Sequence, residues 1–206
     1  GTAEATIVCI DKPVSSRNFN VRSHIIPNLW VIMFMLNTGG KASEWFDSVF
    51  CPDMSKDQFF DEYVPSVLAS FFNNGNPDSL EADLPEYVPF LQGSRYSVEQ
   101  LTAGFSGLKL ETTREKMLPS LIRGNAVYQG QFLREVASLV KLSRKVVTTG
   151  GGAQIKGILQ AKKRWMGDFE YKYQDQSALM GAVMLGQFYQ MKKIPMMPKQ
   201  ILCSHY

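Results

Sequence analysis

Hydrophobic and polar positions in the first 36 residues predict three consecutive strands. Thr6–Ile10 is β-branched and apolar, and Asp11-Lys12-Pro13 breaks this run. Phe19–Ile26 and Leu29–Leu36 are the second and third apolar runs, and Pro27-Asn28 between them suits a tight turn. Three strands at this spacing indicate an antiparallel meander.

Apolar residues at spacings of three or four predict helices in the middle of the chain. We expect the first helix at Lys41–Phe50 and the second at Lys56–Phe72. The clearest helix, Thr113–Leu142, carries a broad apolar stripe. Thr112 and Glu115 have the spacing of a capping box, which would satisfy free backbone N–H groups at its start.

The last third of the chain alternates between strand and helix patterns. A β-branched run, Lys145–Thr149, leads through glycines into an expected helix, Gln154–Met166. A short strand, Phe169–Tyr173, and a final helix, Ser177–Gln190, follow. A meander followed by βα units predicts an α/β domain with a mixed five-stranded sheet flanked by helices.

Length and composition favour one domain that covers residues 1–206. The chain has 206 residues, of which 45% are hydrophobic, so that it can bury a sizeable core. Residues 51–88 are less regular, and we interpret them as an insertion or surface excursion. The acidic side chains of this segment then lie on the surface; they are Asp61, Glu62, Glu81, Asp83 and Glu86.

Charge and cysteine usage exclude several classes of function. The net charge is +3, and short runs such as Lys162-Lys163-Arg164 are typical of a solvated helix face, so nucleic-acid binding is not indicated. Three scattered cysteines and two histidines indicate neither a disulfide framework nor a metal site. We expect a cytoplasmic protein that does not interact with membranes, because the longest apolar run, Leu29–Leu36, is too short to span a bilayer.

The first residues point to a longer protein. The chain begins with Gly1-Thr2-Ala3-Glu4-Ala5 and enters a strand pattern at once, without an initiator methionine or a signal-like segment. We therefore expect a cut inside a longer protein or a processed start.

The densest glycine cluster, Gly150-Gly151-Gly152, follows a predicted strand and precedes a predicted helix. It is not a P-loop, because no Gly-x4-Gly-Lys-Ser/Thr string occurs, and it is not the dinucleotide fingerprint, because Ile155 stands where the last glycine is needed. Glycines let a backbone approach a flat or charged ligand, and a helix N-terminus attracts anions. Taken alone, the cluster is either a ligand-binding turn or a structural corner.

An ordered series of motifs resembles the C-terminal lobe of the FGGY carbohydrate kinases, the family that includes xylulokinase, gluconokinase and glycerol kinase. Gly1-Thr2 is similar to the Gly-Thr turn of this family, and Gly40-Lys41-Ala42-Ser43-Glu44-Trp45 to its second glycine turn. Tyr87-Val88-Pro89-Phe90-Leu91-Gln92-Gly93-Ser94-Arg95 is similar to its Pro-Tyr-Leu-x-Gly-Glu-Arg segment. Thr149-Gly150-Gly151-Gly152-Ala153 resembles its adenosine-binding turn, and Gly181-Ala182 its Gly-Ala-Ala.

The resemblance implies an actin-like, ribonuclease-H-like domain that binds ATP in a cleft between two lobes. The chemistry would be in-line transfer of the γ-phosphoryl group to a sugar hydroxyl with the help of Mg²⁺. On the matching positions, the implied nucleotide contacts are Thr2, Gly40, Gly151, Gly152, Ala153 and Gln154. The implied partners are ATP or ADP and a pentulose or related sugar, and a homodimer is compatible with the resemblance.

The chain departs from the family pattern at three places. Ser94 replaces the acid of Gly-Glu-Arg, Arg123-Gly124-Asn125 replaces Glu-Gly-Val, and Lys162 replaces an acid in the helix beyond the glycine turn. The aspartate base and the sugar-binding lobe of the family precede the Gly-Thr turn, so we identify no catalytic residue here and expect this chain alone to be inactive. The alternative function is a non-catalytic actin-like module that binds a nucleotide or a partner.

Overall fold

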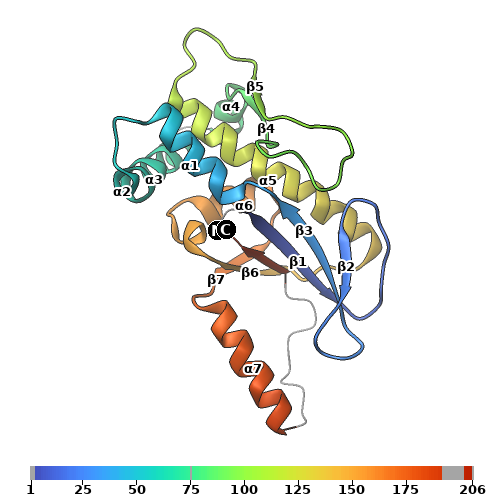
Figure 1. Cartoon of the computed structure of the whole chain (residues 1–206). Helices are drawn as coiled ribbons and strands as arrows, with labels where there is room; N and C mark the ends of the chain where they lie inside the picture. Colours follow the sequence, from blue (N-terminus) through green and yellow to red (C-terminus); the bar gives the residue numbers. More distant parts are fainter. Residues whose placement is uncertain (1–2, 75, 192–201, 206) are drawn as a thin grey trace.

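The computed structural model describes residues 3–74, 76–191 and 202–205 (Figure 1). Its centre is a mixed sheet with the strand order β2-β3-β1-β8-β6-β7. The strands are β1 (Glu4–Ile10), β2 (Asn20–Ser23), β3 (Trp30–Leu36), β6 (Lys145–Thr149), β7 (Glu170–Tyr173) and β8 (Leu202–His205). The expected meander was wrong: β2 and β3 form an antiparallel hairpin, but β1 pairs with β3, so that β3 lies between β1 and β2. Strands β6 and β7 are parallel.

The sheet has six strands, so the expectation of five strands was wrong. The additional strand, β8, lies between β1 and β6, antiparallel to β1 and parallel to β6. Local sequence does not indicate β8 because it is four residues long and ends in Ser204 and His205. Pairing on both of its edges makes it a strand.

Helices and one small hairpin complete the fold. The hairpin consists of β4 (Glu86–Val88) and β5 (Gly104–Ser106). The helices are α1 (Gly39–Phe50), α2 (Lys56–Gln58), α3 (Val64–Asn73), α4 (Pro77–Ala82), α5 (Arg114–Leu139), α6 (Ile158–Trp165) and α7 (Ser177–Met191). A π-helical turn, η1 (Phe59–Tyr63), joins α2 to α3, and a 3₁₀ turn, η2 (Gly151–Gln154), precedes α6.

Three predicted helix starts differ from the structure. Helix α1 begins at Gly39, two residues before the expected Lys41. The N-cap of α5 is Thr113, and the Thr112 hydroxyl accepts a hydrogen bond from the Lys109 backbone N–H at 2.8 Å, so the predicted capping box was wrong. The helix expected from Gln154 begins at Ile158, because Gly157 adopts φ +89° and breaks the helical path. At that φ, Gly157 also fits against Leu68 of α3.

The hydrophobic core lies between one face of the sheet and the helices α1, α5 and α6. Val8, Ile32 and Val146 contribute from the strands, and each is fully buried. Figure 1 shows α1 and α5 on the same side of the sheet. Within residues 51–88, η1 and α3 reach this core through Phe59 and Leu68, whereas α4 has no buried residue.

A buried ion pair connects β1 to α6. The Lys162 ammonium donates to the Glu4 carboxylate, and both side chains are almost completely shielded from solvent. Gly39, at the start of α1, packs directly on Glu4, where a Cβ would lie only 2.3 Å from the Glu4 Cβ. Two residues further along β1, the Thr6 hydroxyl donates to the Gln129 side chain of α5 at 2.7 Å. Polar contacts thus fix β1 to two helices inside the core.

Removing one partner of the pair should strongly destabilise the fold. Lys162→Met leaves the Glu4 carboxylate buried without its cation, and we expect a loss of about 3–5 kcal/mol in the free energy of unfolding. Glu4→Met combined with Lys162→Met should cost less than either single change, because no charge is then stranded.

Urea denaturation of the three variants measures these differences. The matched control is Lys163→Met, which removes only an exposed pair with Asp168 and should change the free energy by less than about 1 kcal/mol. Equal, small losses for Lys162→Met and Lys163→Met would contradict the prediction.

Candidate functional site

A cavity of about 440 Å³ lies where the start of α1 meets the glycine turn η2. Pockets that hold small ligands fall in this range of volume. Segments far apart in the sequence form its walls. The lining residues are Gly40, Ser43 and Glu44 of α1, Phe60 and Asp61 of η1, Val64 of α3, Gly151, Gly152 and Gln154 of η2, Ile155, and Ile158 of α6.

The glycine turn presents its backbone to this cavity. Gly150 leaves β6 with φ +95°, which L-residues rarely adopt, and the Ala153 N–H then donates to the Gly150 carbonyl at 3.2 Å. A Cβ on Gly151 would meet nothing within 4 Å. The backbone at Gly151 therefore faces open space that a bound molecule could fill.

The structure brings together four of the six residues that the sequence predicted as nucleotide contacts. Gly40, Gly151, Gly152 and Gln154 line the same cavity. Ala153 is buried at 4% exposure and is among the residues that line a second cavity of about 500 Å³. Thr2 lies outside the described residues.

Gln154 connects the turn to β7. Its amide nitrogen donates to the Tyr173 hydroxyl at 2.5 Å, and this hydroxyl donates to Asp175 at 3.2 Å. Tyr173 and Asp175 both line the second cavity. The orientation of Gln154 therefore depends on the last residue of β7, Tyr173, and on Asp175 just after it.

Sequence analysis missed the apolar wall of the cavity. Phe60, Val64, Ile155 and Ile158 supply this wall. Phe59 is fully buried in the core, whereas its neighbour Phe60 is partly exposed at the cavity. Both residues belong to a π-helical turn, and such turns are frequent at functional sites.

At the rim of the cavity, oppositely charged side chains form ion pairs. Glu44 accepts hydrogen bonds from the ammonium groups of Lys41, at 2.6 Å, and Lys56, at 2.9 Å. These two bonds lower the pKa of the Glu44 carboxyl to about 2. Two cations thus flank one carboxylate next to the N-terminus of α1. The N-cap residue Thr38 provides no side-chain cap there, which leaves backbone N–H groups of the first turn available to an anion.

The cavity combines features that suit a nucleotide. An apolar wall can pack against a flat ring, and a few polar groups can fix its orientation. The helix N-terminus at Gly40 and the neighbouring Lys41 can attract phosphate oxygens. The arrangement can therefore hold a molecule with an aromatic part and an anionic part.

No family model and no curated protein sequence matches the chain. Among solved structures, the xylulose kinase from Rhodospirillum rubrum superimposes with a TM-score of 0.74 at 17% identity, covering 90% of this chain and 37% of that kinase. The gluconate kinase from Lactobacillus acidophilus gives 0.76 at 16% identity, covering 95% and 38%. Glycerol kinase from Plasmodium falciparum, solved with ADP, gives 0.59 at 14% identity, covering 80% and 31%.

These similarities show the fold. The chain has the α/β fold of a domain in these sugar kinases, and the resemblance to FGGY-type kinases is confirmed at the level of the fold. The chain spans less than half the length of the kinases that it matches. None of the helices in the described part of the chain is long and apolar enough to cross a membrane.

The pKa of Glu44 provides a test of the rim geometry. At a pH of about 3.5, an unperturbed glutamate is mostly protonated, whereas we expect Glu44 to remain ionised until the pH approaches about 2. Because its pKa is lowered in the folded state, Glu44 stabilises the fold above its ordinary value of 4.5, and this contribution is lost as the pH falls through about 2.

An NMR titration of the Glu44 side-chain carboxyl carbon measures this pKa. Lys41→Met is the control, because loss of one donor should raise the Glu44 pKa towards its ordinary value. A Glu44 carboxyl that titrates near 4.5 in the unmodified chain would show that the two lysines do not hold it.

Proposed function

We propose that this chain is the nucleotide-binding lobe of an FGGY carbohydrate kinase. In this proposal the complete protein transfers the γ-phosphoryl group of ATP to a hydroxyl of a pentulose or related sugar. The observation that carries the proposal is the cavity itself, where the glycine turn at Gly151-Gly152 meets the glycine-led start of α1 at Gly40. The sequence resemblance assigns nucleotide contacts to these same two turns.

The cavity suggests how ATP would lie. The adenosine would rest on the backbone of η2 and against the apolar wall that includes Phe60 and Ile158. The phosphates would extend towards Gly40 and Lys41 and, by resemblance, towards Thr2. The N–H groups at the start of α1 would provide fixed positive partial charge for them.

Phosphoryl transfer depends mainly on positioning and on stabilisation of charge. Mg²⁺, bound together with the nucleotide, would neutralise negative charge on the phosphate oxygens. The residues of this chain would hold the nucleotide in place from the adenosine side. Ala153 would contribute indirectly, because its buried side chain holds the backbone of η2 in place.

The general base and most of the sugar site belong, in this proposal, to a lobe upstream of Gly1. General-base catalysis needs a carboxylate within hydrogen-bond reach of the sugar hydroxyl. We therefore expect the isolated chain to bind nucleotide without transferring phosphate. The proposal includes a cytoplasmic location. It is compatible with either a monomer or a homodimer.

A non-catalytic actin-like module is the alternative. Lys162, which stands where the family has an acid, forms a buried pair with Glu4 and serves the core of this protein. The replacement of that acid is compatible with a divergent branch, in which the nucleotide would regulate an interaction instead of supplying a phosphoryl group.

Filling the cavity should weaken nucleotide binding without unfolding the chain. Gly151→Leu places a side chain into open space, and the position has no strained φ, so the fold should be retained. Calorimetric titration with ADP should show an affinity at least about tenfold lower than that of the unmodified chain, because the side chain occupies ligand volume.

The matched control is Gly104→Leu in β5, where a Cβ also meets nothing within 4 Å. This variant should bind ADP as the unmodified chain does. Equal ADP binding by all three proteins would overturn the assignment of the cavity.

The activity is tested on the complete protein with its upstream lobe. ATP consumption should increase with a pentulose, a heptulose or a polyol. ADP binding without any sugar-dependent ATP consumption would support the non-catalytic alternative and contradict the kinase.

A further inference from the structure

The face of the sheet opposite the core is apolar. Ile7 and Cys9 of β1, Val31 and Met33 of β3, and Val147 of β6 point away from the helices that cover the other face. We call these five residues the open face. All five are only partly buried, and none is part of the hydrophobic core.

The apolar side chains of the open face lie next to one another and form a continuous patch. Strand pairing places Ile7 opposite Met33, and Cys9 opposite Val31, so that four apolar side chains adjoin in the middle of the sheet. The flanking strands are polar on this side, with Arg22 in β2 opposite Val31. Strands that are apolar on both faces are typical of sheets covered on both sides.

Helix α7 has a surface that needs a partner. Its fifteen residues, SALMGAVMLGQFYQM, include no charged side chain. Leu179, Met180 and Val183 are 62%, 49% and 48% exposed. A helix that is apolar all round is normally buried.

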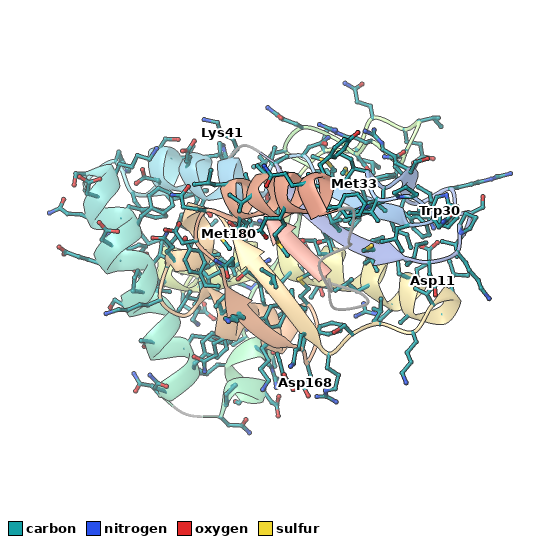
Figure 2. All side chains as sticks on the ribbon, turned by 90° about the horizontal axis from the view of Figure 1, so that it is seen from below. Asp11, Trp30, Met33, Lys41, Asp168 and Met180 are labelled. Carbon is teal, nitrogen blue, oxygen red and sulfur yellow. The ribbon has the colours of Figure 1, made fainter. Side chains whose placement is uncertain are left out.

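In the structure, α7 stands clear of the sheet. Figure 1 shows it extending from the end of β7 on the side of the sheet away from α1 and α5. Figure 2, seen from below, shows α7 in front of the sheet, with Met180 of α7 and Met33 of the open face labelled. No other described helix or strand packs extensively against α7.

The chain topology assigns α7 to the open face. Crossovers between parallel strands are almost always right-handed. The crossover from β6 outward to β7 has α6 on the core side. The next crossover runs in the opposite direction, from β7 back past β6 to β8. The same handedness therefore requires its helix, α7, on the opposite side of the sheet.

We propose that α7 docks onto the open face of its own chain, with Leu179, Met180 and Val183 against Ile7, Cys9 and Met33. The dimensions permit this. Fifteen helical residues span about 22 Å, and β7 and β1 are three strand spacings apart, about 14 Å. The extended arrangement in Figure 1 is then the undocked state.

Cys9 is a native reporter of docking because its thiol lies on the open face. We would compare alkylation rates of Cys9 in the unmodified chain, in Val183→Glu and in Ala178→Glu, at one fixed pH because the thiolate is the reactive form. Peptide mapping by mass spectrometry identifies the modified cysteine. Ala178 is the matched control, because it is exposed and lies about 140° around the helix from Val183.

We expect Val183→Glu to accelerate alkylation of Cys9 on the order of tenfold by removing the cover, and Ala178→Glu to leave the rate unchanged. Equal rates in all three proteins would overturn the proposal, because an undocked α7 protects nothing.

A cross-link tests the same contact without disturbing it. In a Cys203→Ser background, Val183→Cys should be joined to Cys9 within one chain by a short bis-maleimide, since Cys51 is buried. Adding Met33→Glu should abolish the product, whereas Arg22→Glu at the polar edge should not. A product between two chains, or no product, would contradict docking onto the same chain.

Discussion

The buried pair between Glu4 and Lys162 is the constraint on which the candidate site depends. It joins the first strand to α6, and α6 is the helix that follows the glycine turn. Gly39 packs against the same glutamate and thereby sets the start of α1. Both glycine-led walls of the cavity are thus positioned by contacts to one carboxylate. A buried pair is weak evidence for stability as such, but two ions that must meet permit few alternative arrangements.

The cavity is a consequence of tertiary structure. Gly40 and Gly151 contribute backbone from two helix starts, and Phe60 contributes an aromatic wall from a π-helical turn. The rim carries Glu44 between Lys41 and Lys56, so that local charge is balanced next to an uncapped helix N-terminus. This combination of an apolar wall with an anion-binding end is what the proposed nucleotide site requires.

Local sequence patterns predicted the features that depend on local chemistry. The hairpin of β2 and β3, the long helix α5 and the strand–glycine–helix order follow from side-chain periodicity and turn residues. Periodicity did not predict that β1 pairs with β3, which is a tertiary choice of partner. Strand β8 could not be predicted, because pairing on both edges defines it. The late start of α6 depends on how Gly157 meets Leu68, which is a tertiary contact. The role of Phe60 likewise needed the direction of its ring, which periodicity alone does not give.

The central claim is that the turn at Gly151 and the start of α1 bind one nucleotide together. A titration of isotope-labelled chain with ADP, followed through backbone amide resonances in NMR spectra, tests it most directly. The account predicts saturable shifts for the amides of Gly40, Gly151, Gly152 and Gln154 with a common dissociation constant, and none for Gly104 in the distant hairpin. Unchanged amides at Gly40 and Gly151, or shifts confined to another surface, would contradict it.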